Sequence, residues 1–218
     1  MRKKGKLFTV IFTFLFLLLS AAGCGKEFDA SGYLKAVLDN SYKHDPTAFL
    51  EQKIGSEEEA EQLFQEGIDA NIAALTESAS VSQEQEQNFR AIFEQIYAQA
   101  DYTVGEAQKQ EDDSYVVTVT YRPMTLFADT QPQLEEQTEQ LTNSYMEQIA
   151  AGGEAPDEET LTGEIMELYM GILQDAAGSV NYGEETSCQV RIQLDDNVYI
   201  PNTDDLMTLE NGILGVGA

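Results

Sequence analysis

The sequence predicts an α+β fold in which helices pack on a small antiparallel sheet that is built from two β-hairpins. The spacing of hydrophobic residues changes along the chain from a period of about 3.6, typical of helices, to a period of about 2, typical of strands. This change occurs twice, so the order helix, helix, hairpin is expected at about 56–122 and again at about 131–200. A chain of 218 residues, 42% of them hydrophobic, suits a single domain with its own core. Two separate lobes, one for each hairpin, are the alternative arrangement.

The first half of the chain carries several helix start signals before its hairpin. Asp45 and Pro46 form a capping residue followed by a proline that suits the first helical position. Ser56 with Glu59 forms a capping box, and the same pattern recurs 26 residues later. The expected elements are helices at about 33–42, 46–50, 56–76 and 82–97, a strand that begins at Tyr102, a polar turn at 110–114 and a strand at 115–121.

The second half repeats this order and ends in a glycine-containing tail. Asn202 or Thr203 is expected to cap a last short helix that runs through Leu209. Three glycines after residue 211 indicate a flexible tail at 212–218, which leaves 30–211 as the folded domain. The other expected elements are helices at about 134–149 and 161–173 and strands at 188–194 and 198–200.

The amino terminus has the pattern of an export signal. Four basic side chains lie within residues 2–6, an apolar run covers residues 7–19, and small residues occupy positions 20–23. This order is typical of a secretory signal peptide. The apolar run is shorter than the roughly 20 residues that a membrane-spanning helix needs.

Cys24 follows the small residues directly, and Ala21-Ala22-Gly23-Cys24 resembles the lipobox of bacterial lipoproteins. Ala21 stands where that family most often has Leu. The resemblance implies cleavage after Gly23, a diacylglycerol on the Cys24 thiol and an outward-facing position on the cell membrane. The first helical pattern begins soon after Asp29, so a short tether at 24–29 is expected between Cys24 and the domain. The rest of the chain loosely resembles uncharacterised α+β envelope lipoproteins of monoderm bacteria, a resemblance that transfers no site residues.

An ordinary signal peptide is the alternative interpretation of the same segment. Ser20 and Ala22 also fit a cleavage site after Ala22, which would leave Cys24 as a plain thiol. An exported chain with two cysteines could then form a disulfide between Cys24 and Cys188.

The charge of the chain restricts its partners. The 39 acidic and 12 basic residues give a formal net charge of −27. Residues 1–23 hold four of the basic residues and no acid, so from Cys24 onward the balance is 8 − 39 = −31. Nucleic acid is excluded as a partner, because phosphate binding needs clustered Lys and Arg. An anionic membrane surface repels such a domain, so only the lipid would hold it there.

The chain carries none of the common catalytic or metal-binding motifs, and no cofactor is expected. His44 is expected to be an exposed loop residue, and Cys188 an inert thiol on the apolar face of a strand. The acidic turn at 195–197 suits a hairpin better than a calcium site. With so many acidic residues, no particular carboxylate pair can be singled out for a hydrolase.

One segment between the first hairpin and the following helix has a less ordinary composition. Met124, Leu126 and Phe127 follow Arg122 and Pro123 and are candidates for lining an apolar ligand groove. Packing of the following helices on the sheet is the competing explanation.

These observations favour a non-enzymatic, lipid-anchored envelope protein that binds a small apolar ligand, a peptide or another envelope protein. An envelope hydrolase that uses a carboxylate pair and an accessory subunit of an envelope complex are the alternatives.

Overall fold

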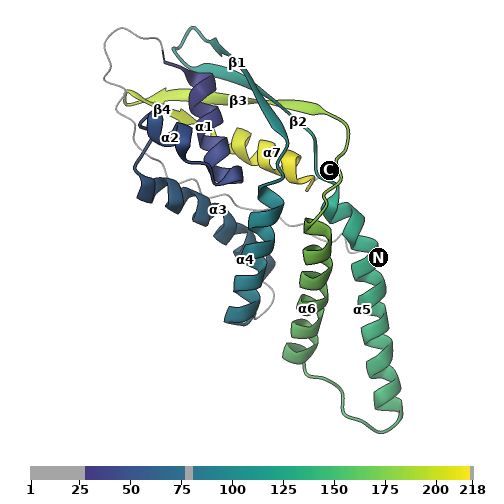
Figure 1. Cartoon of the computed structure of the whole chain (residues 1–218). Coiled ribbons are helices and arrows are strands. Elements are labelled where there is room, and N and C mark those ends of the chain that lie inside the picture. Colours follow the sequence, from purple (N-terminus) through teal and green to yellow (C-terminus); the bar gives the residue numbers. More distant parts are fainter. Residues whose placement is uncertain (1–27, 77–80, 217–218) are drawn as a thin grey trace.

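The computed structural model describes residues 28–76 and 81–216 and shows a sheet covered by helices, with a helical hairpin projecting from one end (Figure 1). The strands are β1 (Tyr102–Lys109), β2 (Tyr115–Tyr121), β3 (Thr186–Asp195) and β4 (Val198–Pro201). The helices are α1 (Ala30–Lys43), α2 (Thr47–Glu51), α3 (Glu57–Thr76), α4 (Gln83–Tyr97), α5 (Leu126–Ala150), α6 (Glu158–Ala177) and α7 (Thr203–Leu214).

The four strands form one antiparallel sheet in the order β1-β2-β3-β4. Tyr115 of β2 pairs with Ile192 of β3, and Val119 pairs with Cys188, so the two hairpins join along their inner strands. The predicted α+β fold with one sheet made of two hairpins is confirmed, and the alternative of a separate lobe for each hairpin is wrong. The doubled order is also confirmed, as α3-α4-β1-β2 followed by α5-α6-β3-β4.

Helices cover one face of the sheet. Along β2, alternate residues from Tyr115 to Tyr121 are buried, while the residues between them are partly exposed. The helix α1 contacts β1 and β2, and α7 contacts β2 and β3. Because side chains of a strand alternate between its two faces, this pattern defines a covered face and a more open one.

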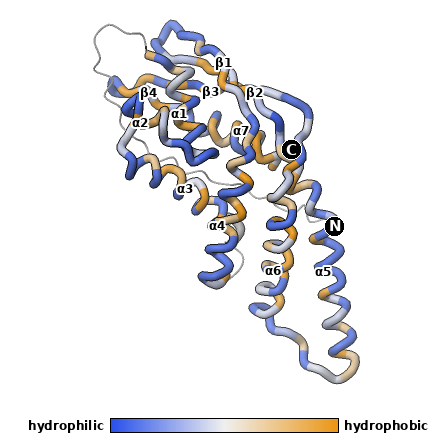
Figure 2. Tube along the Cα trace, viewed as in Figure 1, coloured by the Kyte–Doolittle hydropathy of each residue, from blue (hydrophilic) through white to orange (hydrophobic). Residues whose placement is uncertain are grey.

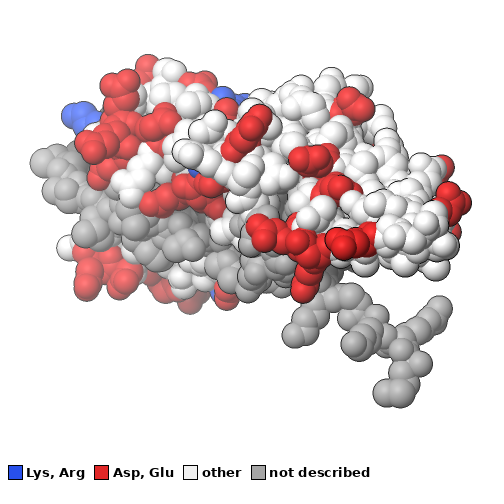
Figure 3. Space-filling model, turned by 90° about the horizontal axis from the view of Figure 1, so that it is seen from below, with Lys and Arg blue, Asp and Glu red and all other residues white. Residues whose placement is uncertain are grey.

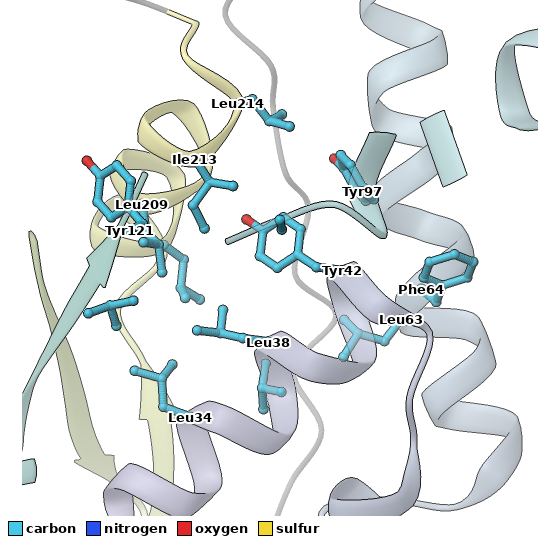
Figure 4. Packing of buried hydrophobic residues seen from close by; sticks show 14 of the residues in the cluster. Leu34, Leu38, Tyr42, Leu63, Phe64, Tyr97, Tyr121, Leu209, Ile213 and Leu214 are labelled. Atoms are coloured by element: carbon cyan, nitrogen blue, oxygen red, sulfur yellow. The ribbon is translucent and has the colours of Figure 1, made fainter. Parts of the chain in front are cut away.

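The core lies between the covered face and the helices. Figure 4 shows Leu34 and Leu38 of α1 near Leu209 and Ile213 of α7, and Figure 2 shows hydrophobic residues along α7 and the neighbouring strands. Each of these four side chains is at most 2% exposed. Full burial of such a side chain stabilises the fold by about 1.5–3 kcal/mol.

The helix start signals are confirmed at most positions. The Ser82 side chain accepts a hydrogen bond from the Gln85 amide at 3.2 Å, and the Gln85 side chain accepts one from the Ser82 amide at 2.8 Å. The box of Ser56 and Glu59 is formed in the same way. At Asp45, however, the carboxylate accepts from the Thr47 amide at 3.0 Å, so the helix begins after Pro46 rather than at it.

Two helix boundaries differ from the prediction by five residues or more. The helix α5 begins at Leu126, well before the expected start, because Leu126 is buried in the core and fixes the first turn ahead of Pro132. The helix α7 continues to Leu214 instead of ending at Leu209. Ile213 and Leu214 are buried there, so the ordered chain extends past residue 211, where the sequence predicts the start of a flexible tail.

Glycines allow α7 to dock closely on the sheet. A Cβ atom at Gly212 would lie 2.2 Å from the Tyr121 hydroxyl oxygen. Gly215 ends the helix with a left-handed φ of 66°, and a Cβ atom there would lie 2.0 Å from the carbonyl oxygen of Met124. Glycine is therefore required at the end of this helix.

Candidate functional site

The chain enters the described domain through an aromatic cluster. The ring of Phe28 stacks on Tyr199 of β4 with 3.9 Å between ring centroids, and it meets Tyr115 of β2 edge-on at 5.7 Å. These contacts fix the entry point beside the start of α1. The predicted lipidation site Cys24 and the predicted cleavage residues Ala21, Ala22 and Gly23 lie outside the described residues.

The three predicted groove residues lie where β2 leads into α5. Met124 and Leu126 are each 2% exposed and belong to the hydrophobic core, while Phe127 is half-buried and packs against it. The Met124 amide donates a hydrogen bond to the carbonyl oxygen of Ile213 at 2.8 Å. These contacts are those of core packing, and a ligand groove at Met124, Leu126 and Phe127 stays a prediction.

A buried carboxyl group that the sequence did not single out lies on α7. Glu210 is only 3% exposed, and the Tyr97 hydroxyl of α4 donates a hydrogen bond to its Oε1 at 2.7 Å. The Asn71 amide of α3 donates to the Tyr97 hydroxyl and, at 3.0 Å, to the carbonyl oxygen of Gly67. These polar groups connect three helices through the core.

Burial dominates the electrostatics of this cluster. It raises the pKa of the Glu210 carboxyl to about 7, although hydrogen bonds from Tyr97 and Asn71 act in the opposite direction. Burial, together with the nearby Glu210 carboxylate, holds the pKa values of Tyr42 and Tyr97 well above the ordinary range. Glu210 therefore exchanges a proton near neutral pH, while both phenols stay protonated.

The signal for Glu210 is visible in the sequence only if α7 is extended to its true end. Leu206, Leu209 and Ile213 form the buried stripe of this helix, and Glu210 lies within that stripe. A helix that ends at Leu209 leaves Glu210 in a loop, so the sequence analysis missed it. An acidic residue inside an apolar helical stripe is the pattern that indicates a buried carboxyl.

A second buried carboxyl has the opposite electrostatic environment. Asp39 of α1 is 7% exposed, forms ion pairs with Lys35 and Lys43, and accepts a hydrogen bond from the Tyr102 hydroxyl at 2.7 Å. Burial alone would raise the pKa of Asp39, but the hydrogen bonds from Lys35 and Tyr102 and both lysine charges lower it overall.

Pairs of acids with pKa values displaced in opposite directions are typical of hydrolase sites. Asp39 and Glu210 have different hydrogen-bond partners, and the ring of Tyr42 contacts both Tyr97, at 5.3 Å, and Tyr102, at 5.8 Å. Neither carboxyl is more than about one-tenth exposed. A substrate therefore has little access to either group, and the geometry suits a polar contribution to the core.

The histidine and the described cysteine take the positions that the sequence predicts. His44 is exposed at the end of α1, stacks on Phe64, and places its Nε2 2.8 Å from the Glu61 carboxylate. Cys188 is a free, half-buried thiol on the same face of β3 as Val190, and burial raises its pKa to about 11. A thiol with this pKa is a poor nucleophile at neutral pH.

Neither a metal centre nor a membrane span is found in the described part of the chain. Residues 28–76 and 81–216 contain no group of three or more His, Cys, Asp or Glu side chains arranged to hold a metal ion. No described helix combines the length and the apolar character needed to cross a bilayer. The turn at Asp196 and Asn197 has left-handed φ angles of 46° and 66°, as a tight hairpin requires.

Comparison with known proteins gives a likeness of fold. No protein-family model and no curated protein sequence matches the chain. The structure is similar to that of a "putative lipoprotein (ycdA)" from Bacillus subtilis, with a TM-score of 0.53 and 13% sequence identity. The alignment covers 85% of this chain and 56% of that one, so this chain spans little more than half the length of its structural neighbour. At this identity the likeness establishes a shared fold.

Proposed function

We propose that the chain is a lipid-anchored, non-enzymatic protein of the bacterial envelope, held on the outer side of the cell membrane by the lipid on Cys24. Its α+β domain binds a small apolar ligand, a peptide or another envelope protein. The order of basic cluster, apolar run, small residues and cysteine in residues 1–24 carries this proposal. The shared fold with a protein described as a "putative lipoprotein" supports it.

The position of Phe28 limits how far the domain can lie from the anchor at Cys24. Phe28 is fixed by its aromatic contacts and follows Cys24 by four residues. Four extended residues span at most about 14 Å, so the end of the domain that carries Phe28 sits close to the bilayer. Two acyl chains hold a protein stably on a membrane, because each buried methylene contributes about 0.8 kcal/mol.

A binding role agrees with the described side chains better than a catalytic one. The opposite pKa displacements of Asp39 and Glu210 are the feature that favours the hydrolase alternative, but both carboxyls are buried among partners that satisfy them. The alternative of an accessory subunit rests on the exposed helical hairpin of α5 and α6. It differs from the main proposal only in the kind of partner.

Metabolic labelling with an alkyne analogue of palmitate tests the anchor. We expect label on the wild-type chain and on Cys188→Ser, and none on Cys24→Ser. The Cys188 variant is the matched control, because it removes the second cysteine of the chain without touching the lipobox. A wild-type chain that is produced and exported without label would contradict the proposal and favour the ordinary signal peptide.

A further inference from the structure

The hairpin of α5 and α6 projects from the body of the molecule (Figure 1). Of the 25 residues of α5, only Leu126 and Thr130 are buried, and both lie in its first two turns. The buried residues of α6 are Ile172, Leu173 and Ala177, which lie in its last two turns. The outer part of the hairpin is therefore covered by no other described element and is held together mainly by its own two helices.

The tip of this hairpin exposes large apolar side chains. Met146 is 63% exposed and Ile149 is 44% exposed, and they are two of the four large hydrophobic residues exposed in the described part of the chain. Residues three apart on a helix lie side by side on one face. Met146 and Ile149 thus form a small apolar surface at the end of α5, which we call the tip surface.

The hairpin is uniformly acidic. Residues 126–177 contain 12 Asp and Glu residues and no Lys, Arg or His. Within the described residues, none of these 12 carboxylates forms an ion pair with a cationic side chain. Figure 3, a view toward the tip, shows Asp and Glu but no Lys or Arg over the part of the molecule where the hairpin lies.

This combination restricts what can cover the tip surface. A second copy of the hairpin would bring two sets of 12 negative charges together, and an anionic membrane or a nucleic acid would also be repelled. A protein surface with an apolar centre and a rim of Lys and Arg matches both the exposed apolar pair and the surrounding carboxylates.

We propose that the tip surface of the α5–α6 hairpin is a docking site for a basic, amphipathic protein segment. The contact is centred on Met146 and Ile149. The carboxylates of Glu147, at the end of α5, and of Glu154, in the loop that follows it, face the basic rim of the partner. The proposal deepens the binding role proposed above by naming the partner class, and it does not depend on the lipid at Cys24.

The fold also suggests where such a partner is met. Figure 1 places the tip at the opposite end of the molecule from the start of α1, beside which Phe28 enters the domain. A helix of 25 residues such as α5 is about 37 Å long. With the anchor near Phe28, the hairpin points away from the bilayer, toward partners in the envelope beyond the membrane surface.

A synthetic helical peptide made of Leu on one face and Lys on the other is the probe. The full chain is immobilised through an affinity tag at its carboxy terminus, so that its capture does not need the lipid. Binding is measured by biolayer interferometry, and the signal of sensors without the chain is subtracted. We expect binding that weakens as salt rises, and a loss of affinity of at least about tenfold in the variant Met146→Ser/Ile149→Ser. The matched control Leu50→Ser/Leu194→Ser changes the other two exposed large hydrophobic residues and should keep wild-type affinity.

A second set of variants, which removes negative charges, separates docking at the tip surface from general attraction to an acidic protein. Glu147→Gln/Glu154→Gln should weaken binding several-fold more than Glu84→Gln/Glu86→Gln, which removes the same charge at the exposed start of α4. The proposal is overturned if the peptide does not bind at all. It is also overturned if the two double variants to Gln weaken binding equally, or if the two double variants to Ser bind with equal affinity. Binding of the hairpin to phosphatidylglycerol vesicles, or dimerisation that Met146→Ser/Ile149→Ser abolishes, would also overturn it. None of these variants changes a residue of the lipobox, so the lipid label on Cys24 is tested separately from this docking site.

Discussion

Replacement of Glu210 by Gln tests the buried cluster in the core. Gln keeps the size of the side chain and an oxygen that accepts the hydrogen bond from Tyr97, but it cannot ionise. In the wild-type chain, burial raises the pKa of Glu210 from 4.5 to about 7. A pKa difference of this size between the unfolded and the folded chain changes the free energy of unfolding by about 3 kcal/mol when Glu210 loses its proton.

The sign follows from the order in which the two states lose the proton. Between about pH 4.5 and pH 7 the unfolded chain has lost its proton at this residue, while the folded chain still holds it. The contribution of Glu210 to stability is therefore complete below pH 4.5, falls as the pH rises through this window, and levels off above about pH 7. Carboxyls with lowered pKa values, such as Asp39 and Asp205, contribute the opposite slope in both proteins.

The assay is urea unfolding followed by circular dichroism at several pH values from 4.5 to 8, on forms of both proteins that begin at residue 25. The difference between the two free energies of unfolding isolates the Glu210 contribution. We expect the free energy of unfolding of Glu210→Gln, relative to that of the wild type, to rise by about 3 kcal/mol from the lowest to the highest pH. Parallel pH profiles for the two proteins would show that Glu210 titrates normally and would refute the reasoning.

Three further substitutions test the backbone and the helix ends. Gly215→Ala should lower the free energy of unfolding by at least about 2 kcal/mol, because the residue has a left-handed φ and its Cβ atom would lie 2.0 Å from the Met124 carbonyl oxygen. A loss well below 1 kcal/mol in urea unfolding would contradict this docking of α7. Gly171→Ala should instead raise the free energy of unfolding by about 0.5–1 kcal/mol in the same assay, because nothing lies within 4 Å of its Cβ position inside α6. A lower free energy of unfolding would argue against this helix. Ser82→Ala should lower the melting temperature through loss of about 1 kcal/mol, since the hydroxyl accepts from the Gln85 amide, and an unchanged temperature would count against the capping box.

Much of the fold was predictable because its signals are local. The capping boxes at Ser56 and Ser82 and the alternation from Tyr115 to Tyr121 depend on residues a few positions apart, so the sequence alone indicates these elements. The doubled order of helices and hairpin follows from the same local periodicities. One antiparallel sheet made of both hairpins was also expected, as the more economical of two arrangements. Only the structure shows that β2 and β3 are the strands that join.

The remaining features depend on contacts between distant segments. Leu126 starts a helix ahead of Pro132 because it is buried in the core, and α7 extends to Leu214 because its end docks on the segment at Met124. The burial of Glu210 follows from that docking, so a helix predicted to end at Leu209 could not reveal it. The exposure of the hairpin tip likewise depends on α5 and α6 packing on each other rather than on the sheet.

The central claim is that the chain is anchored through Cys24, and the mass of its mature amino terminus tests this most directly. The protein is extracted with mild detergent from its own membrane, and the masses of the intact chain and of its amino-terminal peptide are measured by mass spectrometry. We expect a chain that begins at Cys24 and carries the mass of a diacylglycerol. A chain that begins at Gly23 with an unmodified Cys24 thiol would contradict the claim.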